Sequence, residues 1–184
     1  MNQIFAPWRI DWIERDDKNK NEEIDGCVFC ELPEMEDDRD SLILLRSEHS
    51  FVILNNYPYN PGHLMVVPYQ HTGKYDELRD EVLRDHARLK QLTFEAVREG
   101  LDPDGFNTGL NLGHGSGGSI DDHLHTHVVP RWKGDTNFMP ATSDTKVIVE
   151  AIDETYERLY DAFKRIDGVV TTDKENESLV VDEW

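Results

Sequence analysis

The sequence predicts a single α+β domain, with an antiparallel sheet of about five strands and two main helices. Three observations lead to this prediction. Short apolar, β-branched segments separated by turns occupy much of residues 41–132. Two longer segments, 79–100 and about 143–165, instead repeat their apolar residues every three or four positions. The length of 184 residues suits one domain that buries a core without disulfides.

Each strand is expected where a short apolar run lies between turn-forming residues. The loop YPYNPG (57–62) must separate two of them, because its prolines and glycine interrupt strand pairing. The glycine-rich loop GHGSGG (113–118) separates the last two. The five expected strands are SLILLRS (41–47), SFVILNN (50–56), HLMVVP (63–68), GFNTGLNLG (105–113) and HLHTHVVPRW (123–132).

Both predicted helices are amphipathic. The first runs from Arg79 to Glu99, and Gly100 is placed to cap its end. The second runs from about Ser143 to Arg165 and carries its own apolar stripe. The stripe of the second helix is Val147, Ile148, Ala151, Ile152, Tyr156, Leu159, Tyr160 and Phe163.

The domain organisation expected from composition has three parts. Residues 1–40 form an N-terminal segment with the cysteine pair CVFC, and residues 41–166 form the main domain. Residues 167–184 are acidic and polar, so we expect a loose, flexible tail. No internal repeat is visible.

The chain is strongly acidic. It has 38 Asp and Glu against 19 Lys and Arg, a formal net charge of −19 and a pI of about 4.6. Such a charge repels DNA, RNA and anionic membranes, so we expect neither a nucleic-acid nor a membrane partner. An acidic surface suits a halophilic protein in strong salt, where the repulsion is screened, but also a soluble protein in general. Both interpretations remain open.

A cytoplasmic location is expected from the absence of two signals. The N-terminal sequence lacks a basic start followed by an apolar run, so it does not predict a secretory signal. No segment approaches the roughly 18 apolar residues of a spanning helix. Two cysteines are too few for a disulfide framework, which indicates a reducing compartment.

Three histidines alternate along the last predicted strand. On a strand, His123, His125 and His127 point to the same face and form a row of imidazoles. Such a row has three interpretations. It is a chance or merely polar face, a set of metal ligands, or a nucleophilic histidine whose neighbours fix its tautomer. We refer to these three residues as the histidine row.

The surroundings favour the nucleophile. Thr126 stands where the metal-dependent HxHxDH pattern would continue with aspartate. The glycine-rich loop that ends in Ser119 supplies backbone amides suited to an anion. An imidazole facing a cradled phosphate indicates phosphoryl or nucleotidyl transfer through a covalent histidine intermediate.

The pair Cys27 and Cys30 has the spacing of a zinc knuckle. Two buried thiols without a metal remain an alternative, because CxxC alone is a weak signal. A redox pair is disfavoured, since Val28 and Phe29 are not the small polar residues typical of such a turn.

The run HLHTHVV resembles the signature of the histidine triad (HIT) family, in which histidines alternate with apolar residues. The resemblance covers about residues 5–165. The sequence is most similar to the branch of bacterial and archaeal HIT proteins that includes diadenosine tetraphosphate phosphorylases. The further segments that carry it are APWRIDWI (6–13), CVFC, NNYPYNPGHLMVVPYQHTGKYDEL (55–78), NTGLNLGHGSGGSIDDHLHTHVVPRW (107–132) and GDTNF (134–138).

The resemblance implies a HIT fold and a nucleotide hydrolase or phosphorylase. His125 would attack the α-phosphorus of a dinucleoside polyphosphate or an adenylyl phosphoramidate and become nucleotidylated. His127 would contact the phosphate and the leaving group, and His63 would lie beneath His125 and orient the row. The retained third histidine argues against sugar-nucleotide exchange, whose enzymes carry Gln there. A nucleotide-binding regulatory module with weak phosphoramidase activity is the alternative.

The resemblance also implies binding residues, a structural zinc and a homodimer formed through helix 79–100. Ser119 departs from the Gln of many HIT hydrolases, so the choice between water and phosphate as acceptor stays open. His49 or His114 could replace one of the implied zinc ligands. The implied phosphate ligands are Asn111, Gly118 and Ser119, the ribose ligand is Asn56, and Ile53 and Leu54 border the base. The implied Zn²⁺ ligands are Cys27, Cys30, His71 and His123.

Overall fold

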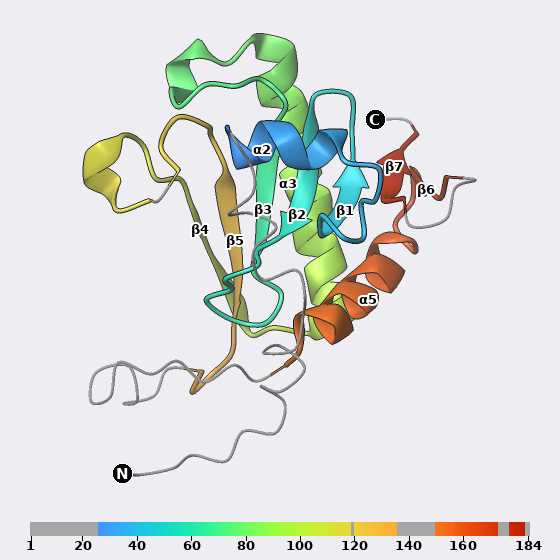
Figure 1. Ribbon diagram of the computed structural model, residues 1–184. Coiled ribbons are helices and arrows are strands. Elements are labelled where there is room, and N and C mark those ends of the chain that lie inside the picture. Colours follow the sequence, from blue (N-terminus) through green and yellow to red (C-terminus); the bar gives the residue numbers. More distant parts are fainter. Residues whose placement is uncertain (1–25, 119, 136–149, 173–176, 183–184) are drawn as a thin grey trace.

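The computed structural model describes residues 26–118, 120–135, 150–172 and 177–182. A sheet of seven strands in the order β4-β5-β3-β2-β1-β7-β6 forms the centre of the described part (Figure 1). The strands are β1 (Ile43–Arg46), β2 (Ser50–Leu54), β3 (Leu64–Pro68), β4 (Gly105–Gly109), β5 (Thr126–Arg131), β6 (Val169–Val170) and β7 (Leu179–Val181).

The first five strands occupy the five predicted segments and pair antiparallel. All residues of β2 and β3 are buried, which explains their nearly continuous apolar sequences. In the register, Met65 of β3 lies opposite His127 of β5. The centre of the sheet therefore positions the third histidine of the row.

The sheet and the tail differ from the expected antiparallel sheet of about five strands with a flexible tail. β7 pairs parallel with β1, and β6 pairs antiparallel with β7, so the sheet is mixed and has seven strands. Leu179 is fully buried. The carboxylate of Asp38 accepts hydrogen bonds from the backbone N–H and the hydroxyl of Ser178, at 3.0 and 2.7 Å. These contacts are long-range, and a three-residue apolar run in an acidic tail does not reveal them.

Replacing Leu179 by alanine should therefore destabilise the whole domain. Deletion of a fully buried leucine side chain costs about 2–5 kcal/mol of unfolding free energy. Urea denaturation followed by circular dichroism measures the change. Val170→Ala, in the same tail but 42% exposed, is the control and should change stability by less than about 1 kcal/mol. Equal effects of the two variants would contradict a buried β7.

Helix α3 (Asp80–Leu101) forms where the apolar periodicity predicted it, but it ends differently. The helix continues through Gly100, and Asp102 caps it with a left-handed backbone, φ 48°. Gly100 instead lies at the contact with the second long helix. A Cβ atom there would be only 3.0 Å from the Cβ of Ala162 and 3.2 Å from the carbonyl oxygen of Arg158. The glycine permits close helix packing.

Helix α5 (Ile152–Phe163) begins later than the predicted start at Ser143. The first part of the prediction, 143–149, lies outside the described residues, and Glu150 and Ala151 are not helical. The buried stripe of α5 packs against α3 and β1. The hydroxyl of Tyr156 donates a hydrogen bond to the carbonyl of Ile43 at 2.8 Å, which joins helix and sheet.

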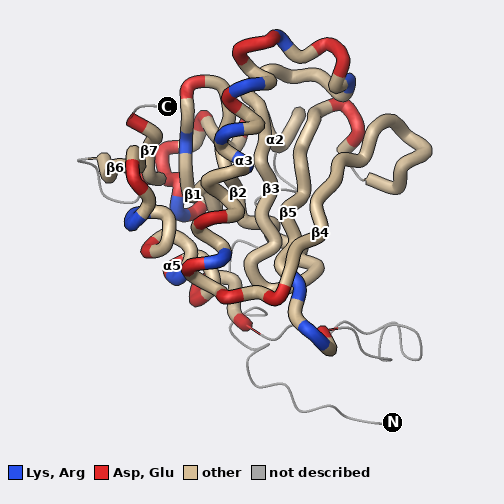
Figure 2. Tube along the Cα trace, turned by 180° about the vertical axis from the view of Figure 1, so that it is seen from behind, with Lys and Arg blue, Asp and Glu red and all other residues tan. Residues whose placement is uncertain are grey.

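The sheet separates two unlike faces. Helix α3 contacts β2, β3 and β5 on one face (Figure 1). The short helix α2 (Val28–Glu31) lies on the other face. Acidic residues are spread over several elements rather than gathered on one, as Figure 2 shows. No helix in the described part of the chain is long and apolar enough to span a membrane.

His86 lies on the buried stripe of α3, directly behind the strand of the histidine row. Its Nε2 is 2.8 Å from the hydroxyl of Thr126, and burial together with the nearby Lys90 lowers its pKa to about 4. The side chain is only 3% exposed, so the folded protein holds it neutral. It is a core residue rather than a metal ligand.

This buried imidazole predicts a loss of stability in acid. Because the folded pKa lies below the unfolded value of about 6.5, the unfolded chain binds one more proton between about pH 6.5 and 4. The contribution of neutral His86 to the free energy of unfolding is fully present above about pH 6.5. It falls by about 1.4 kcal/mol per pH unit between about pH 6.5 and 4. His86→Gln should remove this part of the slope in urea titrations at several pH values. An unchanged slope in the variant would contradict a neutral, buried His86.

Candidate active site

The histidine row is only partly on a strand. β5 begins at Thr126, so His123 and His125 lie in the segment before it, and only His127 belongs to the strand. The rings of His125 and His127 nevertheless lie 4.9 Å apart between centroids. The expected alternation therefore holds for these two rings, although the strand is shorter than predicted.

The second histidine of the row has a defined tautomer. Nδ1 of His125 is 2.9 Å from the carbonyl oxygen of His123. A carbonyl only accepts hydrogen bonds, so Nδ1 carries the proton and Nε2 keeps its lone pair. Burial lowers the pKa of His125, against the opposing effect of the hydrogen bond to His123. The imidazole is therefore neutral near pH 7, as a nucleophile must be.

The hydrogen bond from His63 determines which ring nitrogen of His127, the third histidine of the row, carries the proton. The backbone N–H of Tyr59 donates to Nδ1 of His63 at 3.0 Å, so the proton of His63 is on Nε2. That N–H points at Nδ1 of His127, 2.9 Å away. His127 then carries its own proton on Nε2, so the Asn111 amide, 3.3 Å away, must turn its oxygen toward this N–H to accept a hydrogen bond. Burial, with the neighbouring His125, lowers the pKa of His127 to about 4.

This network corrects one expectation. His63 was expected beneath His125, but it pairs with His127 and orients that ring instead. The reason is the register of β3 and β5, which places Met65 opposite His127 and brings the preceding His63 to the same side. His63 is fully buried and sets the direction of the His127 N–H bond.

A cavity of about 690 Å³ opens in front of the row, and we call it the catalytic pocket. Its lining includes His125 and His127 together with Ile53, Leu54, Asn56, Asn111 and Gly118, the predicted binding residues. Gly118 lies against Asn111, since a Cβ atom at Gly118 would be 3.1 Å from the Cβ of Asn111. Ser119, the remaining predicted phosphate ligand, lies outside the described residues.

Three residues of the site were not identified from the sequence. Asn55 lines the pocket beside Asn56, and its amide contacts Nδ1 of His63 at 3.2 Å. Phe29 lies 5.0 Å from the ring of His125 and walls the pocket from the α2 side. Tyr59 lies 4.6 Å from the ring of His63. The aromatic residues inside CVFC and YPYNPG were the available signals.

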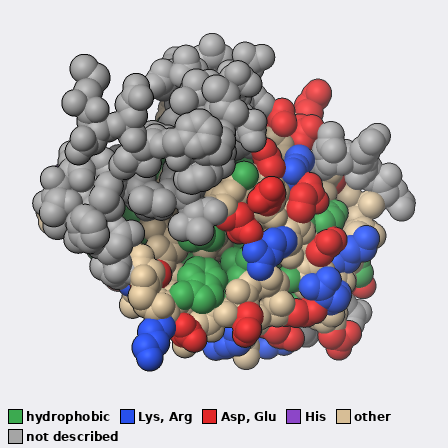
Figure 3. Space-filling model, turned by 90° about the horizontal axis from the view of Figure 1, so that it is seen from below, with side chains coloured by type: hydrophobic (Ala, Val, Ile, Leu, Met, Phe, Trp, Pro, Cys, Tyr) green, Lys and Arg blue, Asp and Glu red, His purple; other side chains and the backbone are tan. Residues whose placement is uncertain are grey.

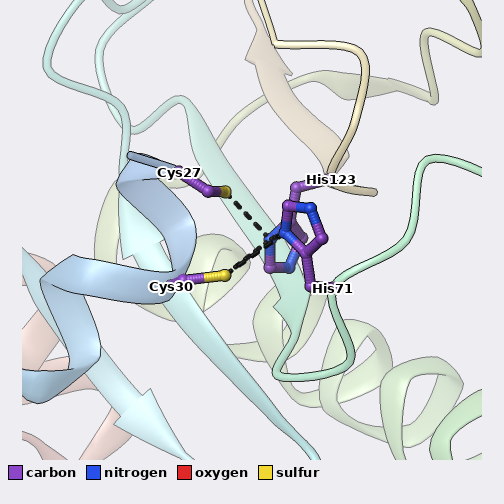
Figure 4. A group of neighbouring side chains, drawn as sticks. All are labelled: Cys27, Cys30, His71 and His123. Carbon is purple, nitrogen blue, oxygen red and sulfur yellow. Dashed lines mark hydrogen bonds between the residues drawn. The ribbon is translucent and has the colours of Figure 1, made fainter. Parts of the chain in front are cut away.

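The first histidine of the row belongs to a different group. Ligand atoms of Cys27, Cys30, His71 and His123 all lie within 4.8 Å of one another, and Figure 4 shows the side chains converging. The two sulfurs come from the start of α2, and the imidazoles come from the loop after β3 and the segment before β5. This is the set that the resemblance implied, rather than one with His49 or His114.

The group fits a tetrahedral metal ion. Nε2 of His123 lies 2.7 Å from the carbonyl of Pro68, so it carries the proton and Nδ1 offers a lone pair to the group. Nδ1 of His123 is 3.2 Å from Sγ of Cys27 and 3.2 Å from Nδ1 of His71. Ligands bound to zinc at 2.0–2.3 Å in a tetrahedron are roughly 3.3–3.8 Å apart. Burial and Cys27 raise the pKa of Cys30 to about 11, so metal binding would release a proton.

The structure thus divides the row between two sites. His123 faces the cysteine pair, whereas His125 and His127 face the catalytic pocket. Phe29 joins the two, because its ring lies 5.6 Å from that of His123 and 5.0 Å from that of His125. A hydrolase that uses the whole row as ligands of one catalytic metal does not fit this arrangement.

Comparison with known proteins agrees with this geometry. The sequence profile of the HIT domain matches residues 36–134, and the chain belongs to the HIT family. It is 36% identical over 160 residues to the AP-4-A phosphorylase of Mycobacterium tuberculosis, covering 84% of this chain and 80% of that protein.

Two further relatives show how far the similarity extends. A bis(5'-adenosyl)-triphosphatase of Dictyostelium discoideum is 31% identical over 97 residues, 53% of this chain and 64% of that protein. A Zn-bound histidine triad family protein from Mycobacterium smegmatis superposes with a TM-score of 0.62 at 28% identity. That superposition covers 77% of this chain and 96% of the other.

Proposed function

We propose that this protein is a nucleotidyl enzyme that cleaves dinucleoside polyphosphates at the α-phosphate through a covalent nucleotidyl–His125. One observation carries the proposal: the bond from Nδ1 of His125 to the carbonyl of His123 directs a neutral Nε2 at the catalytic pocket. The AP-4-A phosphorylase and the bis(5'-adenosyl)-triphosphatase among its relatives support this substrate class.

The reaction then proceeds in two displacements. Nε2 of His125 attacks the α-phosphorus, the bond from phosphorus to the bridging oxygen breaks, and the leaving polyphosphate takes the electron pair. The N–H of His127, held in place by His63, donates a hydrogen bond to the phosphate or the leaving oxygen. Water or inorganic phosphate next attacks the phosphorus, the N–P bond breaks, and free His125 returns.

Different residues of the pocket would contact the base, the ribose and the phosphates of the nucleotide. The apolar residues Phe29, Ile53 and Leu54 suit the base, and Asn55 and Asn56 at the end of β2 suit the ribose hydroxyls. Asn111 and Gly118, which also line the pocket, would hold the phosphates, and Ser119 remains a predicted phosphate ligand.

We propose Zn²⁺ as the occupant of the Cys27, Cys30, His71 and His123 group. Two thiolates and two imidazoles form a closed tetrahedral set with no open position, which is typical of structural zinc. The ion would join α2 to the segment that carries the histidine row. Homodimerisation through α3, a cytoplasmic location and a halophilic origin remain predictions.

Product chromatography tests the reaction and identifies the acceptor. The purified protein is mixed with diadenosine tetraphosphate in molar salt, with and without inorganic phosphate. ATP and ADP formed only with phosphate indicate a phosphorylase, and AMP and ATP formed in water alone indicate a hydrolase. Absence of all three products would contradict the proposed reaction.

A further inference from the structure

A second cavity of about 610 Å³ lies next to the catalytic pocket. Its walls are the loop from Pro58 to Gly62, Trp132 after β5, and the first turn of α5. Leu54 and Tyr59 line both cavities, so the two cavities adjoin at these residues. Viewed from the end of the molecule where α5 begins, hydrophobic side chains lie exposed among acidic and basic ones (Figure 3).

The histidine row leads toward this second cavity. His123 lies at the cysteine pair, and His125 and His127 follow along the chain in the direction of β5, which ends next to Trp132. The ring of Tyr59 lies 4.6 Å from that of His63 and 6.0 Å from that of His127. In an in-line displacement the leaving group departs on the side opposite the nucleophile. Tyr59 also lines both cavities, so a polyphosphate held by His127 has Tyr59 and the second cavity beside it.

The chemistry of the walls suits a nucleoside rather than a phosphate chain. Among the described residues, Asp135 and Glu150 line the cavity paired with Arg131 and Arg158, and Glu154 and Lys133 leave no cluster of free cations for a polyanion. Aromatic faces of Trp132 and Tyr59 can stack on a base. Carboxylates such as that of Glu154 can accept hydrogen bonds from ribose hydroxyls, as acidic residues do in other nucleotide sites.

We propose that the second cavity binds the distal nucleoside of the dinucleoside polyphosphate, the one that departs with the leaving group. This inference rests on the proposed function and extends it, because it assigns a subsite for the half of the substrate that does not react. It predicts a preference for substrates with a nucleoside at both ends. With no cluster of free cations among its described residues, the cavity would take the neutral nucleoside and leave the phosphates at the boundary at Tyr59.

The test compares two substrates that differ only in the distal nucleoside: diadenosine tetraphosphate and adenosine 5'-tetraphosphate. The wild-type protein should have a clearly higher kcat/KM for the first. Trp132→Leu should lower kcat/KM for the dinucleotide by about 10-fold, as loss of one base–aromatic stack does, and leave the mononucleoside unchanged. Trp132→Phe, which keeps an aromatic face, should retain most of the preference.

Glu154→Gln is a second variant, because Glu154 is exposed in the first turn of α5 and its replacement does not disturb the core. It should lower kcat/KM for the dinucleotide alone by about 5-fold, because the amide oxygen of Gln accepts a weaker, neutral hydrogen bond than a carboxylate does. Equal kcat/KM of wild type for the two substrates, or equal losses for both in the variants, would overturn the subsite while leaving the proposed function intact. Failure to cleave either substrate would overturn both.

Discussion

Replacing His125 by alanine is expected to lower turnover of diadenosine tetraphosphate by about 10⁴-fold or more, the effect of removing a catalytic nucleophile. The variant removes the only row imidazole whose Nε2 keeps its lone pair and makes no hydrogen bond within the described residues. Nucleotide affinity should survive, because the apolar wall and Asn111 remain in place. Steady-state kinetics measures the loss, and calorimetric titration with a non-hydrolysable nucleotide measures binding.

His49→Ala is the matched control, since it removes an imidazole from the turn between β1 and β2, away from the pocket. It should change neither kcat nor KM by more than about 2-fold. Unimpaired turnover in His125→Ala would contradict the covalent mechanism. Tight nucleotide binding combined with no turnover in the wild type would instead favour the regulatory binding module.

Loss of the metal is expected to have the second largest effect, and it acts on stability. The purified protein should contain about one zinc ion per chain by elemental analysis. Zinc binds such ligand sets in peptides with roughly 10–16 kcal/mol. Since 1 kcal/mol shifts the Tm of a domain of this size by about 2–4 °C, a strong chelator or Cys30→Ala should lower the Tm by about 10 °C or more.

Two exposed histidines provide a matched comparison for the metal. His71→Ala removes a proposed ligand, whereas His114→Ala removes an imidazole outside the group. Only the first should lower the zinc content and the Tm. Immediate loss of turnover on chelation, in a protein whose circular dichroism is unchanged, would contradict a structural metal and indicate a catalytic one.

Local patterns predicted most of the fold because local physics forms those elements. Alternating or continuous apolar runs between turn residues located β1 to β5, and three- and four-residue periodicity located α3. The tail escaped prediction because its pairing depends on distant partners: Leu179 against β1, and Ser178 against the carboxylate of Asp38. Gly100 reads as a helix cap in sequence, yet its role is set by the approach of Ala162 on another helix.

The candidate site was predictable in its residue types and less so in its contacts. The alternation of histidines and the CxxC spacing are local, so both were visible in the sequence. Which imidazole pairs with which is decided by strand register, and for that reason His63 was placed beneath the wrong ring. Phe29 was read only as part of the cysteine turn, because its contact with His125 exists only once α2 lies against the sheet face.

The central claim is that His125 forms a covalent bond to the α-phosphorus, and trapping that intermediate tests it most directly. The protein is mixed with diadenosine tetraphosphate labelled in the adenosine, quenched in base within milliseconds to seconds, digested and analysed by mass spectrometry. We predict an adenylyl group on the peptide that contains His125, labile to acid and absent from His125→Ala. Active enzyme with no labelled peptide at any quench time, or with the label on another residue, would contradict the account.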